Sequence, residues 1–430
     1  MDPAHETVAL EGIRRSLGAI PFYAKHRELA AAAAHSRSLD DVLAELPLLF
    51  KKDVRSALPK AWLPAGRDPR AELAGGDLEM VETSGSTEER LRILWDKGWW
   101  LRQEERAMRT NPVVARWLDD PAYREAILTT PVCGGGVCHT GDLSYEERCD
   151  EHRVFLNMKP DPTFWREPDM DRMIDEIARH RTVGLEADPA YLAALARHAA
   201  KTGKRIEVSG FTQLTYAMTT RAHIHSIRLA YDGPIYQLYG ASEVGVLFME
   251  SDDGYLHHAP FTTHVELLPA RVATPGAEDV ALVVVSTLDR VAQPLLRFVV
   301  GDLVQVAPHA ARRYTSVPSL RSIEGRVQDA VVRPDGALVT TGAIDRAVFG
   351  VVDRVQDYQV TQETKDSVTV DVVPRGEGDG EAAIADALAP LFRGLTVTVR
   401  KSAAIQAEAS GKFRVVRRAF PIDVAKLFAR

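Results

Sequence analysis

The sequence predicts an α/β protein made of a large N-terminal domain with mixed α/β structure and a small α/β C-terminal domain. Three observations lead to this prediction. The chain has 430 residues, 45% of them apolar, so it can bury a large core but exceeds one ordinary domain. Up to about residue 325, long helical segments alternate with short apolar runs. Beyond that point the segments become shorter, and strand-like alternation of apolar and polar residues dominates.

One helix of the large domain shows both of its ends in the sequence. Asp188 can cap a helix, Pro189 suits a first turn, and Gly203 suits a helix end. The run between them, "AYLAALARHAA", has a helical apolar face. Residues 281–288, "ALVVVSTL", are nearly all apolar, which predicts a strand covered on both faces. A second helical run, "GWWLRQEERAM", contains Trp99 and Trp100, and we expect both rings to lie in the core.

The tail after residue 330 shows a different pattern. Residues 367–373 and 395–401 alternate apolar and polar side chains, as strands with one buried face do. Between them, residues 377–392 form a helix candidate that follows a Gly-rich turn. The tail is therefore a small α/β unit of roughly 100 residues.

Composition disfavours several classes of protein. The net charge of −7 gives little reason to expect nucleic-acid binding, and the basic segments "ARRYTSVPSLRS" and "KFRVVRR" are short. The sequence shows no signal-peptide pattern and no run of eighteen apolar residues, so we expect no membrane association. Three cysteines suit reduced thiols better than a disulfide framework. We expect a cytoplasmic protein that binds no nucleic acid.

A cluster of hydroxyl side chains follows an apolar run near residue 80. Thr83, Ser84, Gly85, Ser86 and Thr87 form this short loop, and no Gly-Lys-Ser follows it. Hydroxyls and backbone N–H groups in a tight Gly-containing turn can converge on phosphate oxygens without a positive charge. The alternative is an ordinary surface loop. The loop is therefore a candidate phosphate site only in combination with other signals.

Four further loops bring groups that a nucleotide can use. Residues 235–245, "IYQLYGASEVG", place an aromatic ring beside a turn with a hydroxyl and the acid Glu243, and a carboxylate beside phosphates can hold Mg²⁺. Asp302 lies within strand-like sequence, where burial of an acid needs a compensating partner such as a ribose hydroxyl. Arg326 lies at the predicted domain boundary, and Lys412 lies in a Gly-flanked loop near the end of the chain.

In this order, the loops resemble those of the adenylate-forming superfamily of acyl-CoA synthetases, peptide-synthetase adenylation domains and luciferases, in particular its phenylacetate-CoA ligase-like branch. The resemblance covers nearly the whole chain. The segments that carry it are "GAIPFYAKH", "LPLLFKKDVR", "TSGST", "YGASE", "LLRFVVGDL", "GRVQD" and "SGKFRVV". The resemblance implies a small domain that is mobile about a hinge. The implied divisions are an adenylation domain over 1–325, a hinge over 326–329 and a small domain over 330–430, which carries the catalytic lysine.

The resemblance also implies roles for individual residues. Lys412 is the implied catalytic cation, which contacts the carboxylate and the α-phosphate, and Glu243 assists it by holding Mg²⁺. The implied contacts to ATP come from Thr83, Ser84, Gly85, Ser86, Thr87, Tyr239, Gly240, Ser242, Asp302 and Arg326. Fixed cations suit this chemistry, because attack on the α-phosphorus builds charge on phosphate oxygens.

The implied activity is ATP-dependent formation of an acyl-adenylate with release of pyrophosphate, followed by transfer to a thiol or another acceptor. The branch favours aromatic acids. The acceptor stays open between CoA, a carrier protein, an amine and a reductase partner in natural-product biosynthesis, and so does the oligomeric state, with a dimer among the options. A catalytically altered relative that binds acyl-AMP is the alternative, because Glu88 and Glu89 place negative charge beside the phosphate loop.

The segment "CGGGVCHTGDLSYEERC" allows two interpretations. The turn formed by Cys133, Gly134, Gly135 and Gly136 lets the backbone approach a flat ligand, which suits a wall of the acyl pocket. Alternatively, Cys133, Cys138 and Cys149 supply thiolates that Zn²⁺ prefers, although their spacing matches no paired C-x-x-C knuckle.

Overall fold

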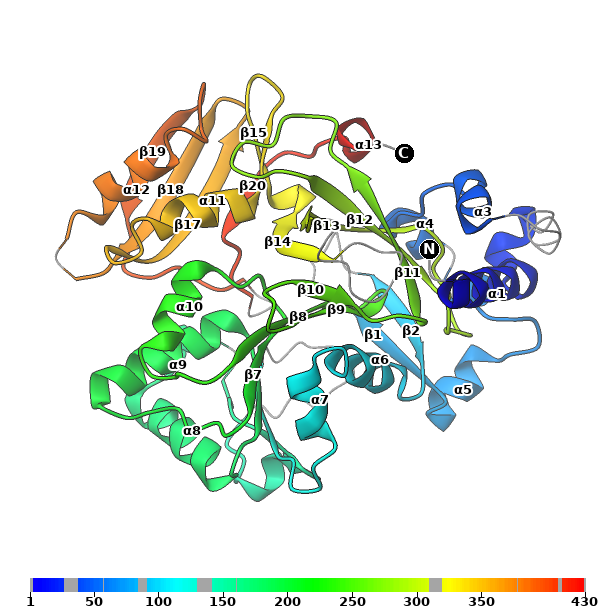
Figure 1. Ribbon diagram of the computed structural model, residues 1–430, viewed down its shortest axis with the longest axis horizontal. Helices are drawn as coiled ribbons and strands as arrows, with labels where there is room; N and C mark the ends of the chain where they lie inside the picture. The colour runs from blue at the N-terminus through cyan, green and yellow to red at the C-terminus, as the bar shows by residue number, and fades with distance from the viewer. Residues whose placement is uncertain are drawn as a thin grey trace.

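The structure is a computed structural model (Figure 1) that describes residues 3–26, 38–56, 58–83, 91–129, 141–159, 161–308, 319–376, 378–408 and 412–428. It is a mixed α/β protein with one large mixed sheet and a smaller sheet beside it, as the sequence predicts. The large sheet has twelve strands in the order β11-β12-β13-β14-β10-β9-β8-β7-β6-β3-β5-β4.

Five consecutive strands toward the β4 end of this sheet are parallel. The parallel strands are β3 (Glu125–Leu128), β5 (Arg153–Phe155), β6 (Gly184–Ala187), β7 (Phe211–Leu214) and β8 (Ile235–Ala241). Apolar residues of one sheet face pack against α8 (Glu167–Arg179), α9 (Pro189–Thr202) and α10 (Arg221–Arg228). The other face packs against α6 (Trp99–Met108) and α7 (Pro112–Leu118) (Figure 1). Successive strand residues point to opposite faces, so the two faces can differ in character.

The remaining strands of the large sheet are antiparallel to their neighbours. They are β4 (Cys149–Asp150), β9 (Gly245–Glu250), β10 (Leu256–His258), β11 (Thr263–Pro269), β12 (Val280–Thr287), β13 (Phe298–Val306) and β14 (Leu320–Arg326). Every residue of β12 is buried, as its apolar sequence predicts. A separate hairpin is formed by β1 (Leu78–Glu82) and β2 (Arg92–Asp96). The N-terminal helices are α1 (Pro3–Ala19), α3 (Leu39–Glu45), α4 (Lys51–Arg55) and α5 (Pro69–Gly75).

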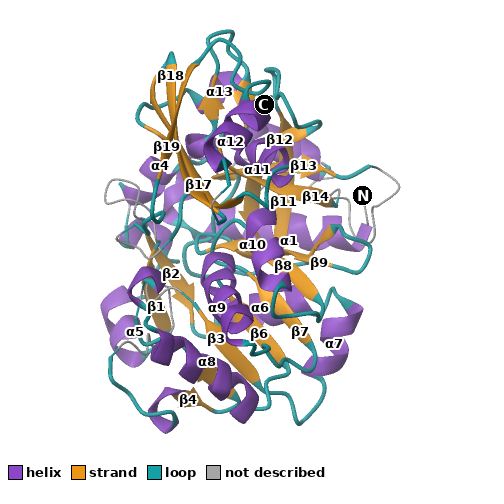
Figure 2. Cartoon of the chain, turned by 90° about the vertical axis from the view of Figure 1, so that its left-hand side faces the viewer, coloured by secondary structure: helices purple, strands orange, loops and turns teal. Residues whose placement is uncertain are grey.

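The tail forms the smaller sheet. Its strands are β17 (Val355–Thr364), β18 (Ser367–Pro374), β19 (Thr396–Lys401) and β20 (Val416–Arg418), in the order β19-β18-β17-β20. Two helices, α11 (Thr341–Phe349) and α12 (Gly380–Leu388), share a separate apolar core with it. Two short strands, β15 (Val331–Val332) and β16 (Leu338–Val339), pair after the end of β14, and α13 (Val424–Leu427) lies near the C-terminus (Figure 2). The predicted strands at 367–373 and 395–401 and the predicted helix between them are confirmed.

Local sequence signals account for the helix ends. The side chain of Asp188 accepts a hydrogen bond from the Ala190 amide, Pro189 begins α9, and Gly203 ends it with a left-handed φ of 73°. All three observations confirm the predicted helix. Near the end of β8, a Cβ atom at Gly240 would lie 2.7 Å from the backbone oxygen of Gly245. Only glycine fits there without a shift of the hairpin backbone.

Candidate functional site

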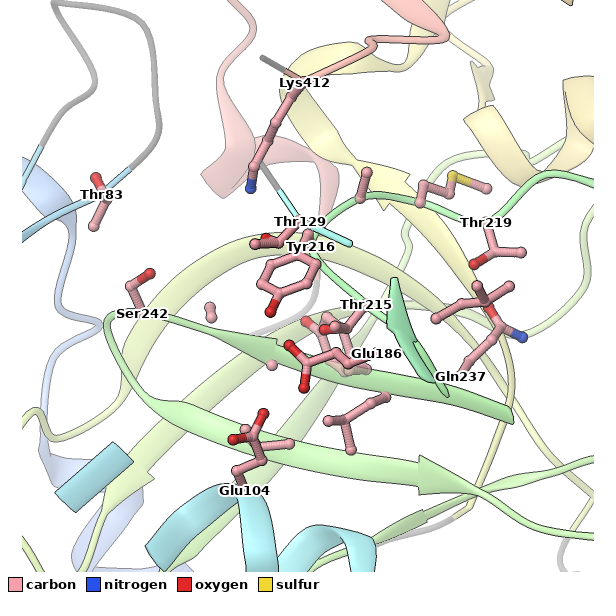
Figure 3. Close-up of a pocket in the computed structure, with 18 of the residues that line it drawn as sticks. Thr83, Glu104, Thr129, Glu186, Thr215, Tyr216, Thr219, Gln237, Ser242 and Lys412 are labelled. Carbon is pink, nitrogen blue, oxygen red and sulfur yellow. The ribbon is translucent and has the colours of Figure 1, made fainter. Parts of the chain in front are cut away.

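One cavity of about 770 Å³ lies where the large sheet meets the tail. It is lined by residues from separate parts of the chain that the sequence singles out, namely Thr83, Tyr239, Gly240, Ser242, Glu243, Asp302, Arg326 and Lys412. Figure 3 shows Thr83, Ser242 and Lys412 around this space. Of the other predicted site residues, Ser84, Gly85, Ser86, Thr87, Cys133, Gly134, Gly135 and Gly136 lie outside the described residues. The structure therefore brings eight of the sixteen predicted residues to one place.

Lys412 enters the cavity from the tail, between β19 and β20 (Figure 3). Its backbone oxygen accepts a hydrogen bond of 2.9 Å from the Glu408 amide. The neighbouring Phe413 ring packs edge-on against Tyr191 of α9, with ring centroids 6.4 Å apart. Arg414 forms an ion pair with Asp329, which follows β14. These contacts connect the loop that carries Lys412 both to the large sheet and to the segment joining the two parts.

Tyr239, Asp302 and Arg326 form a contiguous polar group in the cavity wall. The Tyr239 hydroxyl donates a hydrogen bond of 2.9 Å to Asp302 Oδ2, and Arg326 Nε lies 3.7 Å from Asp302 Oδ1. Burial raises the pKa of the Asp302 carboxyl, and Arg326 and Tyr239 partly offset this effect. Adjacent strands create the group, because Asp302 of β13 lies opposite Arg326 of β14.

Glu243 is a buried carboxylate with a cationic neighbour. The amine of Lys51, from α4, lies 3.0 Å from Glu243 Oε1, and its side chain also lines the cavity. Burial acts to raise the pKa of Glu243, but attraction from Lys51 and hydrogen bonding outweigh it, so the pKa is lowered. Glu243 is therefore ionised at neutral pH.

Thr83 stands at the base of the hydroxyl loop. Its hydroxyl accepts a hydrogen bond of 3.0 Å from the Leu91 amide, which closes the β1–β2 hairpin below the loop. The described part of the loop is thus fixed to the hairpin. Trp99 is buried in the core, as predicted, whereas Trp100 stacks on Trp95 with centroids 5.0 Å apart and also lines the cavity.

The sequence reasoning missed several cavity residues. Besides Lys51, these include three carboxylates, Glu104 of α6, Glu125 of β3 and Glu186 of β6, and the basic Arg153 of β5. Of these residues, Glu186 is the one that the sequence could have indicated. It interrupts the short run "VGLEA", in which an ionisable side chain is costly to bury.

Neither a family model nor a curated protein sequence matches this chain. Solved structures do. A 2-hydroxyisobutyryl-CoA ligase in the postadenylation state, in complex with R3-HIB-AMP, aligns with a TM-score of 0.67 and 14% identity over 97% of this chain and 90% of that one. This is the fold of an acyl-CoA ligase. An anthranilate CoA ligase, in complex with anthranoyl-AMP, aligns with a TM-score of 0.52 and 11% identity over 78% of this chain and 64% of that one.

A second state of the first of these ligases aligns less well with this chain. The same 2-hydroxyisobutyryl-CoA ligase in its thioesterification state aligns with a TM-score of 0.55 and 16% identity, over 97% of this chain and 91% of that one. The covered lengths are nearly equal, and this TM-score is lower than the 0.67 of the postadenylation structure. Our structure is therefore more similar to the postadenylation structure of that ligase than to its thioesterification structure.

The described residues include neither a cluster of metal-binding side chains nor a helix able to cross a membrane. No group of three or more His, Cys, Asp or Glu side chains there is arranged to hold a metal ion. Of the three cysteines, Cys149 is described as a free thiol at the cavity wall, and Cys133 and Cys138 lie outside the described residues. Within the described chain, no helix combines the length and apolar character needed to cross a membrane.

Proposed function

We propose that this protein activates a carboxylic acid with ATP to form an acyl-adenylate and then transfers the acyl group to a thiol, with CoA as the first candidate. The observation that carries the proposal is that Lys412, from the tail, faces the same cavity as Asp302 and Glu243 of the large sheet. The acyl-CoA ligase fold supports it, and several structures with this fold contain acyl-AMP.

In the first step, a carboxylate oxygen of the acid attacks the α-phosphorus of ATP. A new carbon–oxygen–phosphorus anhydride forms, and the bond from the α-phosphorus to the bridging oxygen of the β-phosphate breaks. That oxygen takes the electron pair, and pyrophosphate leaves. Lys412 is proposed to hold the acid and the α-phosphate together and to offset the charge that develops on phosphate oxygens. In the second step, the acceptor attacks the acyl carbon, and AMP leaves.

The remaining cavity residues are proposed to bind ATP. Asp302, oriented by Tyr239, accepts hydrogen bonds from the ribose hydroxyls, and Arg326 approaches from the same side. Thr83 and the hydroxyls that follow it contact the β- and γ-phosphates. Gly240 and Ser242 lie where the nucleotide passes the β8–β9 turn.

Mg²⁺ fits this site at one residue. Glu243 is buried and ionised, and Mg²⁺ is usually held by one or two carboxylates together with substrate phosphates. When bound, Mg²⁺ would neutralise phosphate charge. Because Lys51 pairs with the same carboxylate, Glu243 is held in the cavity wall before any metal arrives.

We further propose that the acid is aromatic and that the protein belongs to the phenylacetate-CoA ligase-like branch. Trp100, Phe155 and Val246 give the cavity wall apolar surface suited to a flat ring. The tail is proposed to turn about residues 326–329 between the two steps, which would separate Lys412 from the cavity for acyl transfer. An altered relative that only binds acyl-AMP is the second candidate, favoured by the acidic Glu88 and Glu89.

The test is ATP–pyrophosphate exchange with a panel of aryl, heteroaryl and aliphatic acids. We expect exchange with at least one acid and a loss of about 10²–10³-fold in Lys412→Ala, because one fixed cation of this kind contributes on that scale. Lys426→Ala is the matched control, since Lys426 is an exposed lysine of the same tail. ATP binding without exchange for any acid would favour the altered relative.

A further inference from the structure

Two carboxyl groups face each other in the cavity, away from the residues that are proposed to bind ATP. Glu104 comes from α6 and Glu186 from β6, on opposite walls. Figure 3 shows them pointing toward one another, with the Tyr216 ring between them and Lys412 in that view. Each carboxyl group also acts on the pKa of the other. The cavity therefore has a cationic group at one end and an acidic pair at the other.

One cation, Arg153, acts on the acidic pair, and its charge partly offsets the effect of burial on the pKa of both Glu104 and Glu186. This cation is shared, because its Nε forms an ion pair with Glu125 Oε2 at 3.0 Å. Glu125 also accepts a hydrogen bond of 3.2 Å from the Tyr123 hydroxyl, so that carboxylate is satisfied. Burial raises the pKa of Glu104 to about 7 and raises that of Glu186 well above its usual range. Without a ligand, the pair therefore retains a proton at neutral pH.

A buried amide beside the pair gives independent evidence of a missing partner. Gln213 of β7 is 1% exposed, and its Nε2 donates a hydrogen bond of 2.6 Å to Glu186 Oε2. The other end of the amide, Oε1, is buried and has no hydrogen-bond partner among the described residues. A buried acceptor in this condition destabilises the fold unless a donor reaches it. The two carboxyls line the cavity and Gln213 lies behind Glu186, so three acceptor groups lie close together.

An alkylammonium group matches these three acceptors. It has three N–H donors and one positive charge, and it carries no acceptor that would conflict with carboxylates. A neutral hydroxyl supplies one donor and no positive charge, so it cannot replace the proton that the pair retains. Apolar side chains, including Ile127, Phe155 and Leu101, also line the cavity. The surroundings therefore suit a ligand with an apolar body and a charge of opposite sign at each end.

We propose that the acid activated in this cavity carries a cationic amine at the end opposite its carboxylate, held by Glu104, Glu186 and Gln213. The inference rests on the proposed function, because it assigns the carboxylate to the Lys412 end. The acidic pair would also exclude the reversed orientation, since a carboxylate placed there meets two acids.

The experiment compares acids that differ only in this charge. The pairs are 4-(aminomethyl)benzoate with 4-ethylbenzoate, and 6-aminohexanoate with heptanoate. For the wild-type protein, we expect kcat/KM in ATP–pyrophosphate exchange to be at least about 10-fold higher for the amine of the preferred pair. Glu186→Gln and Glu104→Gln should each lower the value for the amine by about 10–100-fold. Both should leave the value for the neutral partner within about 3-fold.

Glu105→Gln is the matched control, because Glu105 neighbours Glu104 on α6 but pairs with Arg109 at the surface. It should change neither value. If near-UV circular dichroism shows that Glu186→Gln does not fold, the comparison uses Glu104→Gln alone, because Glu104 is only half-buried.

The outcomes separate the two proposals. Exchange that favours the neutral acids would overturn this inference and support the proposed function. If the protein binds ATP but none of the acids supports exchange, the proposed function would be overturned. Calorimetry would then test the inference by measuring binding of each acid directly. Tighter binding of the amine than of its neutral partner, lost in Glu186→Gln, would support the amine site. Equal binding of both members of each pair would overturn it.

Discussion

The Lys51 amine lies 3.0 Å from the Glu243 carboxylate in the wall of the cavity. The Glu243 side chain is 7% exposed and that of Lys51 is 31% exposed, so the carboxylate depends on this cation more than the cation depends on it. The pair joins α4 of the N-terminal region to the turn after β8. It therefore has a structural role besides any contact with a nucleotide.

Lys51→Met is expected to lower the free energy of unfolding by about 1–2 kcal/mol at pH 7, a value reduced for the partial exposure of Lys51. The lowered pKa of Glu243 means that the pair stabilises the fold above the usual carboxyl pKa and stops doing so as pH falls through the folded-state pKa. The difference between wild type and variant should therefore shrink toward pH 4. Urea denaturation at several pH values measures it, with the exposed Lys52→Met as control. A constant difference would contradict this assignment.

The hydrogen bond from Tyr239 to Asp302 provides a second prediction. Tyr239→Phe removes the donor, which leaves Asp302 buried and raises its pKa further. We expect the Kd for ATP to rise by about 3–10-fold at pH 7, on the scale of one hydrogen bond to a charged group. Affinity should fall further as pH falls through the raised pKa, because a protonated Asp302 accepts ribose hydroxyls less well.

Calorimetric titration with ATP checks this prediction. Tyr236→Phe is the control, because Tyr236 lies three residues earlier on β8 and donates to Asp252, an exposed residue outside the cavity wall. An equal loss of ATP affinity in the two variants would show that the Tyr239–Asp302 bond has no special role.

The elements and residues that could be predicted are those whose sequence pattern lies within one short stretch of chain. The cap, proline and terminal glycine of α9 lie within one stretch of chain, and β12 is apolar throughout. Asp302 interrupts an apolar segment, and Tyr239 and Lys412 lie beside glycines in short polar stretches, where a functional side chain stands out in sequence. Their meeting in one cavity follows from their place in the acyl-CoA ligase fold.

The residues that could not be predicted depend on packing between distant elements. Glu104 lies on the polar side of an amphipathic helix, where a solvated glutamate is the ordinary interpretation, and only the packing of α6 on the sheet turns it toward Glu186. Lys51 is one of two adjacent lysines, and nothing local distinguishes it from exposed Lys52. Tertiary structure alone decides which member of such a pair is buried.

A buried ion pair connects β14 to the tail and gives a third prediction. Glu324 is fully buried and accepts from Arg346 of α11 at 2.6 Å, and Arg346 also donates to the Gly276 carbonyl at 2.9 Å. Arg346→Met leaves the buried carboxylate without this cation, so we expect a loss of about 3 kcal/mol in unfolding free energy.

The double variant Arg346→Met/Glu324→Gln should lose less than the sum of the two single variants, because the pair is removed together. Chemical denaturation of all three measures the coupling, with the exposed Arg354→Met as reference. Additive losses would indicate that the two residues act independently.

The Asp188 carboxyl group interacts electrostatically with the Lys412 amine. Its Oδ1 caps α9, and its Oδ2 is buried without a hydrogen-bond partner among the described residues. Burial raises the pKa of Asp188 to about 6, and the positive charge of Lys412 acts in the opposite direction. A buried carboxylate of this kind can hold the lysine amine in position without touching a substrate. We therefore treat Asp188 as a positioning residue.

Asp188→Asn removes the charge and keeps the cap, since asparagine caps a helix about as well as aspartate. We expect the exchange rate at pH 7.5 to fall by about 3–10-fold, the scale of one partly screened charge interaction. The wild-type rate should fall as pH drops through about 6, where Asp188 takes up a proton, and the variant should lack this step. Because the raised pKa makes the ionised form destabilising, the variant should be at least as stable as the wild type at pH 7. A rate loss with the same acid limb in both proteins would show that Asp188 does not act through Lys412.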